Sequence, residues 1–317
     1  MTPYLSVVIP IFNEEANIAN LWGRLRAVLE GHFTDPDRPW EVVFTDDGSR
    51  DRSLDLLQEI AREDARVCVV EFNRNYGQHA AIFGAFAVAQ GRVIVTMDAD
   101  LQNPPEEVPK LVAKIEEGFD VVGGWRQGRM ANDSLFRTLP SKIVNAVTRK
   151  TTGVRLHDYG CMLRAYRREV VDAMLLCRER SSFIPALANS FAKRITEVPV
   201  EHAERAAGDS KYGFWKLINL QFDLLTSFSL LPLQMLSVLG VIVSALGIGF
   251  GIVLLVYRVL HPEGTVEGVF TLFAVLFFFV GAQFLAFGLL GEYIGRIYQE
   301  VRDRPRYVIK KVHKLEN

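Results

Sequence analysis

Cysteine is scarce in this sequence of 317 residues, and its positions argue against a disulfide framework or a zinc site. The three cysteines are Cys68, Cys161 and Cys177, and they form neither a C-x-x-C pair nor another metal-ligand spacing. We therefore expect reduced thiols, as in a cytosolic protein.

An excess of positive charge is also lacking. Lysine and arginine number 36 against 37 aspartate and glutamate residues, which gives a formal net charge of -1. We therefore expect no nucleic acid as a partner, and any anionic ligand must meet local clusters of Arg and Lys. Residues 1–5 show no basic segment before an apolar one, so we expect no cleavable signal peptide and a first domain that remains in the cytoplasm.

Apolar runs alternate with helical patterns along the first hundred residues. The predicted strands are 5–11, 41–44, 67–72 and 93–97. Helical periodicity follows each of the first three, the third over 80–89. This alternation predicts an α/β fold with a parallel sheet covered on both faces, and such sheets bind ligands at the carboxyl ends of their strands. Neither G-x-G-x-x-G after the first strand nor G-x-x-x-x-G-K-[ST] occurs, so the usual dinucleotide and P-loop sites are not supported.

Acidic and amide side chains follow the first two predicted strands. The candidates for nucleotide binding there are Pro10, Asn13, Glu14, Asp46 and Asp47. Carboxylate and amide oxygens can accept hydrogen bonds from ribose hydroxyls or from a base N–H. Helix capping by Asn13 and a turn at Gly48 would account for the same residues, and this alternative stays open.

A second acidic motif follows the fourth predicted strand. Asp98, Asp100 and the Gln102 amide are candidate ligands of one divalent cation, Mg²⁺ or Mn²⁺, because such ions take oxygen ligands and leave room for water and phosphates. The ion would neutralise a departing nucleoside diphosphate. Capping of the next helix by the two aspartates is the alternative.

Two long uncharged stretches near the carboxyl terminus predict a transmembrane hairpin over 233–294, with spans of about 233–257 and 269–292. Basic residues flank the hairpin on both sides, which predicts a cytoplasmic location for both ends. Apolar residues at helical spacing over 211–232 predict an amphipathic segment lying at the bilayer surface. A soluble amphipathic helix packed on the first domain fits that segment equally well.

Several of these motifs resemble a known enzyme family. Val7–Glu14, Asp46–Ser49 and Asp98–Asp100 are similar to inverting family 2 glycosyltransferases of GT-A fold. Arg74–His79, Asp158–Arg164 and Gly288–Tyr307 extend the resemblance over nearly the whole chain, to the polyprenyl-phosphate glycosyltransferases. The Gln-x-x-Arg-Trp signature of processive family members does not occur, which disfavours polysaccharide synthesis.

The resemblance implies a substrate pair and a location. Asp158–Arg168 with Phe183–Pro185 look most like the group that transfers 4-deoxy-4-formamido-L-arabinose for lipid A modification and polymyxin resistance. It implies a UDP-sugar donor, undecaprenyl phosphate as acceptor, and a homotetramer in the bilayer of the bacterial inner membrane. The implied organisation is a catalytic GT-A domain over 1–210, the segment 211–232, the hairpin, and a cytoplasmic basic tail over 295–317.

The resemblance also implies residue roles. Asp100 and Asp158 are the candidate catalytic residues, and Arg205 and Lys211 are candidates for the donor diphosphate. The candidates for the acceptor phosphate are Arg126, Arg129, Arg137 and Lys142. Solvated surface charge is the alternative for each of these cations, and a structural bond to a backbone amide is the alternative for Asp158.

Two other functions stay open at this point. A polyprenyl-phosphate transferase that uses UDP-glucose would need the same metal and diphosphate chemistry, while GDP-mannose fits the extended motifs less well. A catalytically inactive membrane scaffold belongs to a different class, and the intact acidic motifs count against it.

Overall fold

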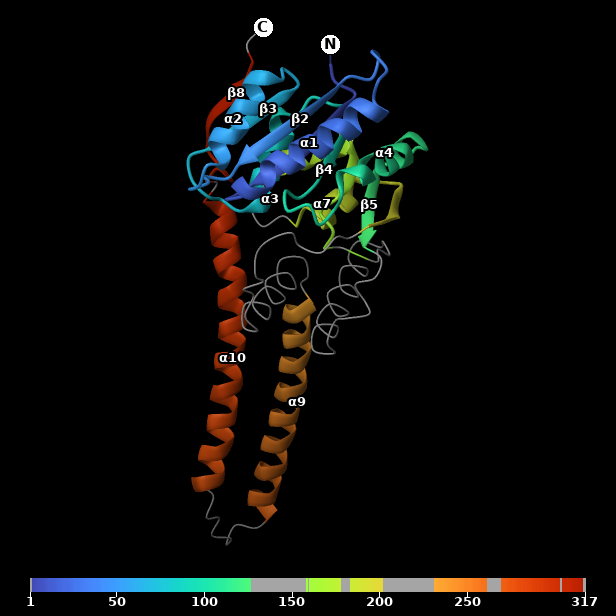
Figure 1. The fold of residues 1–317 in the computed structure, drawn as a ribbon. Coiled ribbons are helices and arrows are strands. Elements are labelled where there is room, and N and C mark those ends of the chain that lie inside the picture. The colour runs from blue at the N-terminus through green and yellow to red at the C-terminus, as the bar shows by residue number, and fades with distance from the viewer. Residues whose placement is uncertain are drawn as a thin grey trace. The chain divides into compact units, whose positions relative to one another are not determined.

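The computed structural model describes residues 2–126, 158, 160–177, 183–201, 231–260, 269–302 and 304–315. The chain divides into two compact units (Figure 1). The sheet unit comprises Met1–Leu217 with Arg304–Asn317, and the helical unit comprises Ile218–Asp303.

A mixed sheet of eight strands forms the centre of the sheet unit, in the order β7-β5-β6-β4-β1-β2-β3-β8. Its strands are β1 (Leu5–Ile11), β2 (Trp40–Asp46), β3 (Val67–Phe72), β4 (Val93–Thr96), β5 (Val121–Arg126), β6 (Arg164–Arg167), β7 (Ile195–Val200) and β8 (Ile309–Lys314). The four neighbours β4, β1, β2 and β3 are parallel, as the alternation with helices predicts. However, β6 runs antiparallel to β4 and β5, and β8 runs antiparallel to β3. The sheet is therefore mixed and not parallel throughout.

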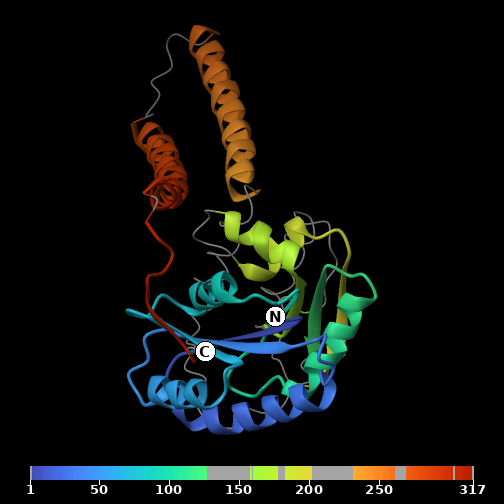
Figure 2. The ribbon, with the colours of Figure 1, turned by 90° about the horizontal axis from the view of Figure 1, so that it is seen from above.

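Helices cover both faces of this sheet (Figure 2). One face carries α1 (Glu15–His32), α2 (Ser53–Glu63) and α4 (Val108–Glu116). A short 3₁₀ turn, η1 (Pro105–Glu107), directly precedes α4. The other carries α3 (Gln78–Val88), α6 (Arg168–Leu176) and α7 (Ile184–Phe191). Side chains of β1 alternate between the two cores, with Val7 on the α1 side and Val8 on the α3 side. The sheet is thus buried on both faces, which explains the apolar runs of its strands.

The segment after the second long helix, Arg304–Asn317, belongs to the sheet unit, whereas the sequence predicts a basic tail over 295–317. Its strand β8 pairs with β3 along the edge of the sheet. Just before β8, the Tyr307 ring stacks on Phe72 with centroids 5.0 Å apart and planes 8° apart. The Glu71 carboxylate on β3 contacts Lys310 Nζ, and it lies 2.9 Å from Nε2 of His313. The carboxyl-terminal segment therefore completes the sheet.

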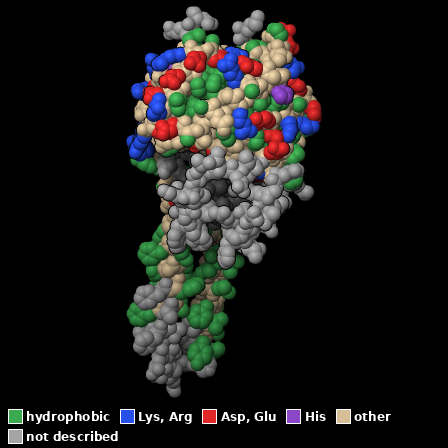
Figure 3. Space-filling view, viewed as in Figure 1, with side chains coloured by type: hydrophobic (Ala, Val, Ile, Leu, Met, Phe, Trp, Pro, Cys, Tyr) green, Lys and Arg blue, Asp and Glu red, His purple; other side chains and the backbone are tan. Residues whose placement is uncertain are grey.

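The described part of the helical unit consists of α9 (Leu231–Leu260) and α10 (Val269–Val301). Both contain a stretch long and apolar enough to cross a membrane, Leu233–Val253 and Phe278–Gly295. None of the first stretch and 6% of the second is buried in the structure. Hydrophobic side chains gather on these helices, whereas both signs of charge are mixed over the sheet unit (Figure 3).

Candidate active site

The carboxyl ends of three neighbouring strands meet at one edge of the sheet. β1 lies between β2 and β4 and is parallel to both, with Ile11 opposite Asp46 and Val8 opposite Thr96. The residues that follow β1, β2 and β4 are therefore neighbours at this edge. This juxtaposition brings together the three acidic and amide motifs that the sequence places at strand ends.

Asp46 ends β2 as a buried carboxylate with one unused oxygen. Its side chain is 1% exposed, and Oδ2 accepts a hydrogen bond from the Ser49 amide at 3.2 Å. Oδ1 is buried without a partner among the described residues. Burial raises the pKa of Asp46 above its ordinary value. An unpaired buried acceptor is costly, so Oδ1 is suited to receive a donor from a ligand.

The end of β1 is tied to the loop that follows β2. Asn13 adopts a left-handed backbone with φ of 55°, its Oδ1 accepts from the Arg50 amide at 2.8 Å, and its own amide donates to Ser49 Oγ at 3.0 Å. The Glu14 amide donates to Ser53 Oγ at 2.9 Å. Pro10 has no amide hydrogen, but the pairing of β1 with β4 ends at Val8, so Pro10 breaks no bond on that side.

Asp47 binds the loop that leads into α3. Its Oδ1 accepts from the Tyr76 amide at 2.7 Å, and its Oδ2 accepts from the Gly77 amide at 2.8 Å. Burial and the neighbouring charge of Asp46 outweigh these hydrogen bonds and raise the pKa of Asp47. The adjacent Gly48, with φ of +69°, lets the backbone of Arg74 approach so closely that a Cβ would lie 2.6 Å from its carbonyl carbon. Both oxygens of Asp47 thus hold the protein's own backbone.

Asp98 and Asp100 lie just after β4. Oδ1 of Asp98 accepts a hydrogen bond from Gln78 Nε2 at 2.6 Å, and Oδ1 of Asp100 accepts one from the Gln102 amide at 3.1 Å. Directly after Asp100, Leu101 has a left-handed backbone with φ of 58°. Burial and the charge of Asp100 raise the pKa of Asp98 to about 6, and the charge of Arg126 opposes them.

This donor set fits a divalent cation that keeps part of its coordination for ligands. The charge of Asp100 disfavours the charged form of Asp98, a cation would offset this effect, and Gln102 follows both carboxylates on the same loop. No group of three or more His, Cys, Asp or Glu side chains in the described residues could hold a metal ion by itself. Mg²⁺ sites with one or two protein carboxylates complete the shell with water and phosphate oxygens.

Arg126 and Asp158 form a bidentate ion pair beside these carboxylates. Nε of Arg126 donates to Oδ2 of Asp158 at 2.6 Å, and Nη2 donates to Oδ1 at 2.9 Å. Burial lowers the pKa of Arg126, but the hydrogen bond to Asp158 and the charges of Asp158, Cys161 and Asp98 together outweigh it and raise the pKa overall. The Gly160 amide also donates to Oδ1 of Asp158, at 3.0 Å. The two candidate residues are therefore brought together as one fixed pair.

Two residues that are not among the predicted site residues hold the backbone around Asp158. Arg164 on β6 is fully buried, and it donates to the carbonyl oxygens of Asp158 at 3.1 Å and Cys161 at 3.0 Å. Oε1 of Glu197 on β7 accepts from the Asp158 amide at 3.1 Å. Gln78 is a third residue that is not among the predicted site residues, because its position at the start of α3 does not indicate that its side chain reaches Asp98. These contacts depend on which strands and helices become neighbours in the fold, and no local pattern in the sequence predicts that.

Five candidate residues lie outside the described residues. They are Arg129, Arg137 and Lys142 for the acceptor phosphate, and Arg205 and Lys211 for the donor diphosphate. Their roles stay predictions.

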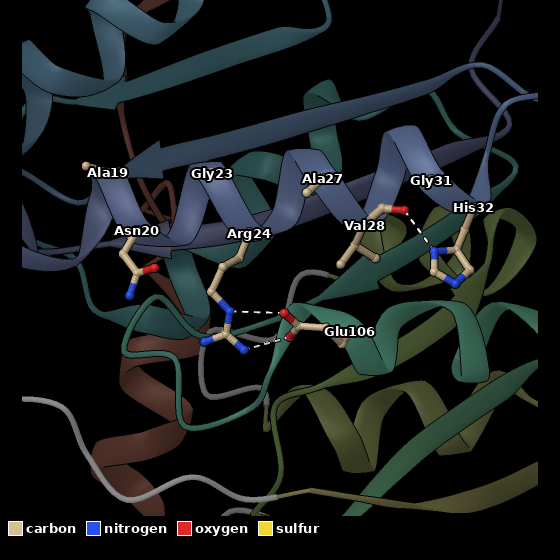
Figure 4. A pocket seen from close by; sticks show the side chains of 9 residues that line it. All are labelled: Ala19, Asn20, Gly23, Arg24, Ala27, Val28, Gly31, His32 and Glu106. Atoms are coloured by element: carbon tan, nitrogen blue, oxygen red, sulfur yellow. Dashed lines mark hydrogen bonds and ion pairs between the residues drawn. The ribbon is translucent and has the colours of Figure 1, made fainter.

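A shallow groove elsewhere on the sheet unit contains none of the candidate residues. It runs along the outer face of α1 past Ala19, Gly23 and Ala27 (Figure 4). An ion pair between Arg24 and Glu106, 2.7 Å from Nη2 to Oε2, lies across it.

Comparison with known proteins gives consistent matches. The family model described as Glycosyl transferase family 2 matches residues 6–175. The undecaprenyl-phosphate 4-deoxy-4-formamido-L-arabinose transferase of Salmonella paratyphi A is 54% identical over 310 residues, 97% of this chain and 93% of that protein. The protein of the same name from Salmonella choleraesuis is 53% identical over the same shares. Mannosyl-3-phosphoglycerate synthase from Rubrobacter xylanophilus is similar in fold, with a TM-score of 0.50 and 12% identity over 70% of this chain and 71% of that chain.

Proposed function

The chain belongs to glycosyl transferase family 2, and from that premise we propose that it transfers 4-deoxy-4-formamido-L-arabinose from a UDP-linked donor to undecaprenyl phosphate. One observation carries the choice of sugar and acceptor: identity of 54% across 97% of the chain and 93% of a transferase of that name. The match includes the GT-A sheet unit and both apolar helices. It favours this reaction over UDP-glucose transfer and over an inactive scaffold.

The ends of β1 and β2 hold the nucleotide. The unused Oδ1 of Asp46 accepts a hydrogen bond from the base, and Pro10, Asn13 and Glu14 border the same space. Asp47 contributes through the loop that its two oxygens hold. The support for this arrangement is the buried, unpartnered acceptor at the end of β2.

The end of β4 serves the leaving group. Asp98, Asp100 and Gln102 hold Mg²⁺ or Mn²⁺. When bound, such an ion supplies positive charge to the departing diphosphate. Arg205 and Lys211 are the candidates that add positive charge for that diphosphate. We assign Asp100 as the residue whose loss removes this stabilisation.

The acceptor needs positioning more than it needs a base. An anionic oxygen of the lipid phosphate forms the new bond to the anomeric carbon, and UDP leaves from the opposite face with the electron pair of the broken C–O bond. The configuration at that carbon is therefore inverted, and no proton has to be removed from the nucleophile. Arg126, Arg129, Arg137 and Lys142 position the phosphate, and Asp158 orients Arg126 through its bidentate ion pair.

The helical unit brings the enzyme to its lipid substrate. α9 and α10 span the bacterial inner membrane as a hairpin, with the sheet unit and both termini in the cytoplasm. The segment 211–232 lies at the bilayer surface. The exposed apolar side chains of both helices support insertion. A homotetramer rests on the family resemblance and is tested by the mass of the purified protein in detergent.

Transfer of labelled sugar to undecaprenyl phosphate tests this function. Purified full-length protein is supplied with UDP-4-deoxy-4-formamido-L-arabinose, UDP-glucose or GDP-mannose, with Mg²⁺, Mn²⁺ or chelator. We expect chelator-sensitive labelling of the lipid from the first donor alone. Labelling from UDP-glucose would keep the chemistry and overturn the assigned sugar, and absence of labelling from every donor would support the inactive scaffold.

A further inference from the structure

The loop before α3 connects the two acidic motifs of the site. Its backbone is held at the end of β2, where both oxygens of Asp47 accept the amides of Tyr76 and Gly77 at 2.7 and 2.8 Å. Asp47 is 2% exposed, so these bonds are shielded from competing water. The close approach of Arg74 to Gly48 fixes the loop from the other side. The position of this loop is therefore set by β2.

The next residue along the chain reaches the second motif. α3 begins at Gln78, directly after Gly77 with its φ of 94°, and Gln78 Nε2 donates to Oδ1 of Asp98 at 2.6 Å. Asp47 and Asp98 are thus linked through two backbone amides and one side-chain amide. Any shift of the loop would move Nε2 away from Oδ1.

The chemistry of an amide suits this contact. Asp98 and Asp100 are two carboxylates separated by one residue, and a Lys or Arg at position 78 would compete with a metal cation for the Asp98 carboxylate. A neutral N–H donor fixes the rotation of the carboxylate and leaves its negative charge available. Carboxylate ligands of metal ions are commonly held by hydrogen bonds of this kind.

We propose that Gln78 is a positioning residue that orients Asp98 for the divalent cation, and that Asp47 acts on the cation site through Gln78. This inference rests on the proposed function, because it concerns the cation assigned there. It gives Asp47 a role in metal binding, in place of direct contact with the nucleotide.

Direct binding of Mn²⁺ tests the proposal. Full-length protein in detergent is titrated with MnCl₂ in the presence of UDP, and the free ion is measured by its electron paramagnetic resonance signal. Gln78→Met keeps the length of the side chain and removes the donor, and we expect Mn²⁺ affinity to fall about 10- to 100-fold. The melting temperature without Mn²⁺ should stay unchanged, since Gln78 is exposed. Gln90→Met, an exposed site just beyond the other end of α3, is the matched control and should bind Mn²⁺ as the wild type does.

A double-mutant cycle tests the part assigned to Asp47. Asp47→Asn replaces one acceptor oxygen by a donor, and we expect it to weaken Mn²⁺ binding as well. The Asp47→Asn/Gln78→Met double variant should bind Mn²⁺ no more weakly than the single variant with the lower affinity. Both changes break the same connection from Asp47 through Gln78 to Asp98. Losses that multiply would overturn the role of Asp47, and wild-type affinity in Gln78→Met would overturn the proposal as a whole. A wild-type protein that binds no Mn²⁺ with UDP would instead refute the cation site of the proposed function, and the inference with it.

Discussion

Replacing Tyr307 by alanine is expected to lower the stability of the sheet unit by about 2–4 kcal/mol. The half-buried ring stacks on Phe72, and its hydroxyl donates to the Phe83 carbonyl at 3.3 Å. Partial burial of a ring contributes about 1–1.5 kcal/mol. The aromatic pair adds about 0.5–1.5 kcal/mol, and the long hydrogen bond adds about 0.5–1 kcal/mol.

Tryptophan fluorescence can report this loss without interference from the helical unit. Three of the four tryptophans, Trp22, Trp40 and Trp125, lie on α1, β2 and β5 of the sheet unit, and Trp215 lies outside the described residues. For a unit of this size, the expected loss lowers the apparent melting temperature by about 5–15 °C.

Two further variants show whether the loss of stability in Tyr307→Ala comes from the stacked ring. Tyr307→Phe keeps the stacked ring and should cost about 0.5–1 kcal/mol, the hydrogen bond alone. Val308→Ala is the control on the neighbouring residue, because Val308 is 41% exposed. If Tyr307→Ala melts within about 1 °C of the wild type, an amount below 0.5 kcal/mol, then the carboxyl-terminal segment does not stabilise the sheet unit.

Three other perturbations give separate tests. Arg164→Met should destabilise the sheet unit by about 2–4 kcal/mol in urea titrations, since it leaves the carbonyls of Asp158 and Cys161 without their buried donor; stability within 0.5 kcal/mol of the wild type would contradict this. Glu71→Gln should reduce the loss of stability in acid. Burial raises the pKa of Glu71, but hydrogen bonds from Lys310 and His313 hold it below the ordinary 4.5, so its contribution is complete above pH 4.5 and is lost as the pH falls further through the folded-state pKa. Melting curves from pH 6 to 3 check this, and parallel curves for both proteins would refute it. Asp100→Ala should lower sugar transfer by about 100-fold or more while the hairpin stays inserted, whereas the exposed control Glu63→Ala should keep full turnover.

The central strands could be predicted from the sequence because their signal is local. Leu5–Ile11 and Val67–Phe72 are mainly apolar runs, each with one polar residue (Ser6 and Glu71), and the structure gives both with the predicted bounds. β6 and β8 have no such signal. Their sequences, RAYR and IKKVHK, are short and charged. β8 also pairs with a strand about 240 residues earlier in the chain, which no window of sequence can reveal.

The site was predictable to the level of strand ends and not to the level of contacts. Asp46 and Asp98 follow apolar runs, so parallel pairing alone brings them to one edge. The partner of each carboxylate depends on the rotation of side chains from other elements. That Asp98 meets Gln78, and that Asp158 meets Arg126 from a strand 32 residues earlier, follows only from packing.

The pairing of β8 with β3 makes the helical unit an insertion within the sheet unit and not an addition to its end. A shortened protein that stops at residue 217, made to obtain a soluble enzyme, would lose an edge strand together with the helices. The freed edge of β3 would then expose amide and carbonyl groups able to pair with another chain, a recognised route to aggregation. Excision of 218–303 with a flexible linker to Arg304 keeps that edge covered, and it is the more promising design for a water-soluble form.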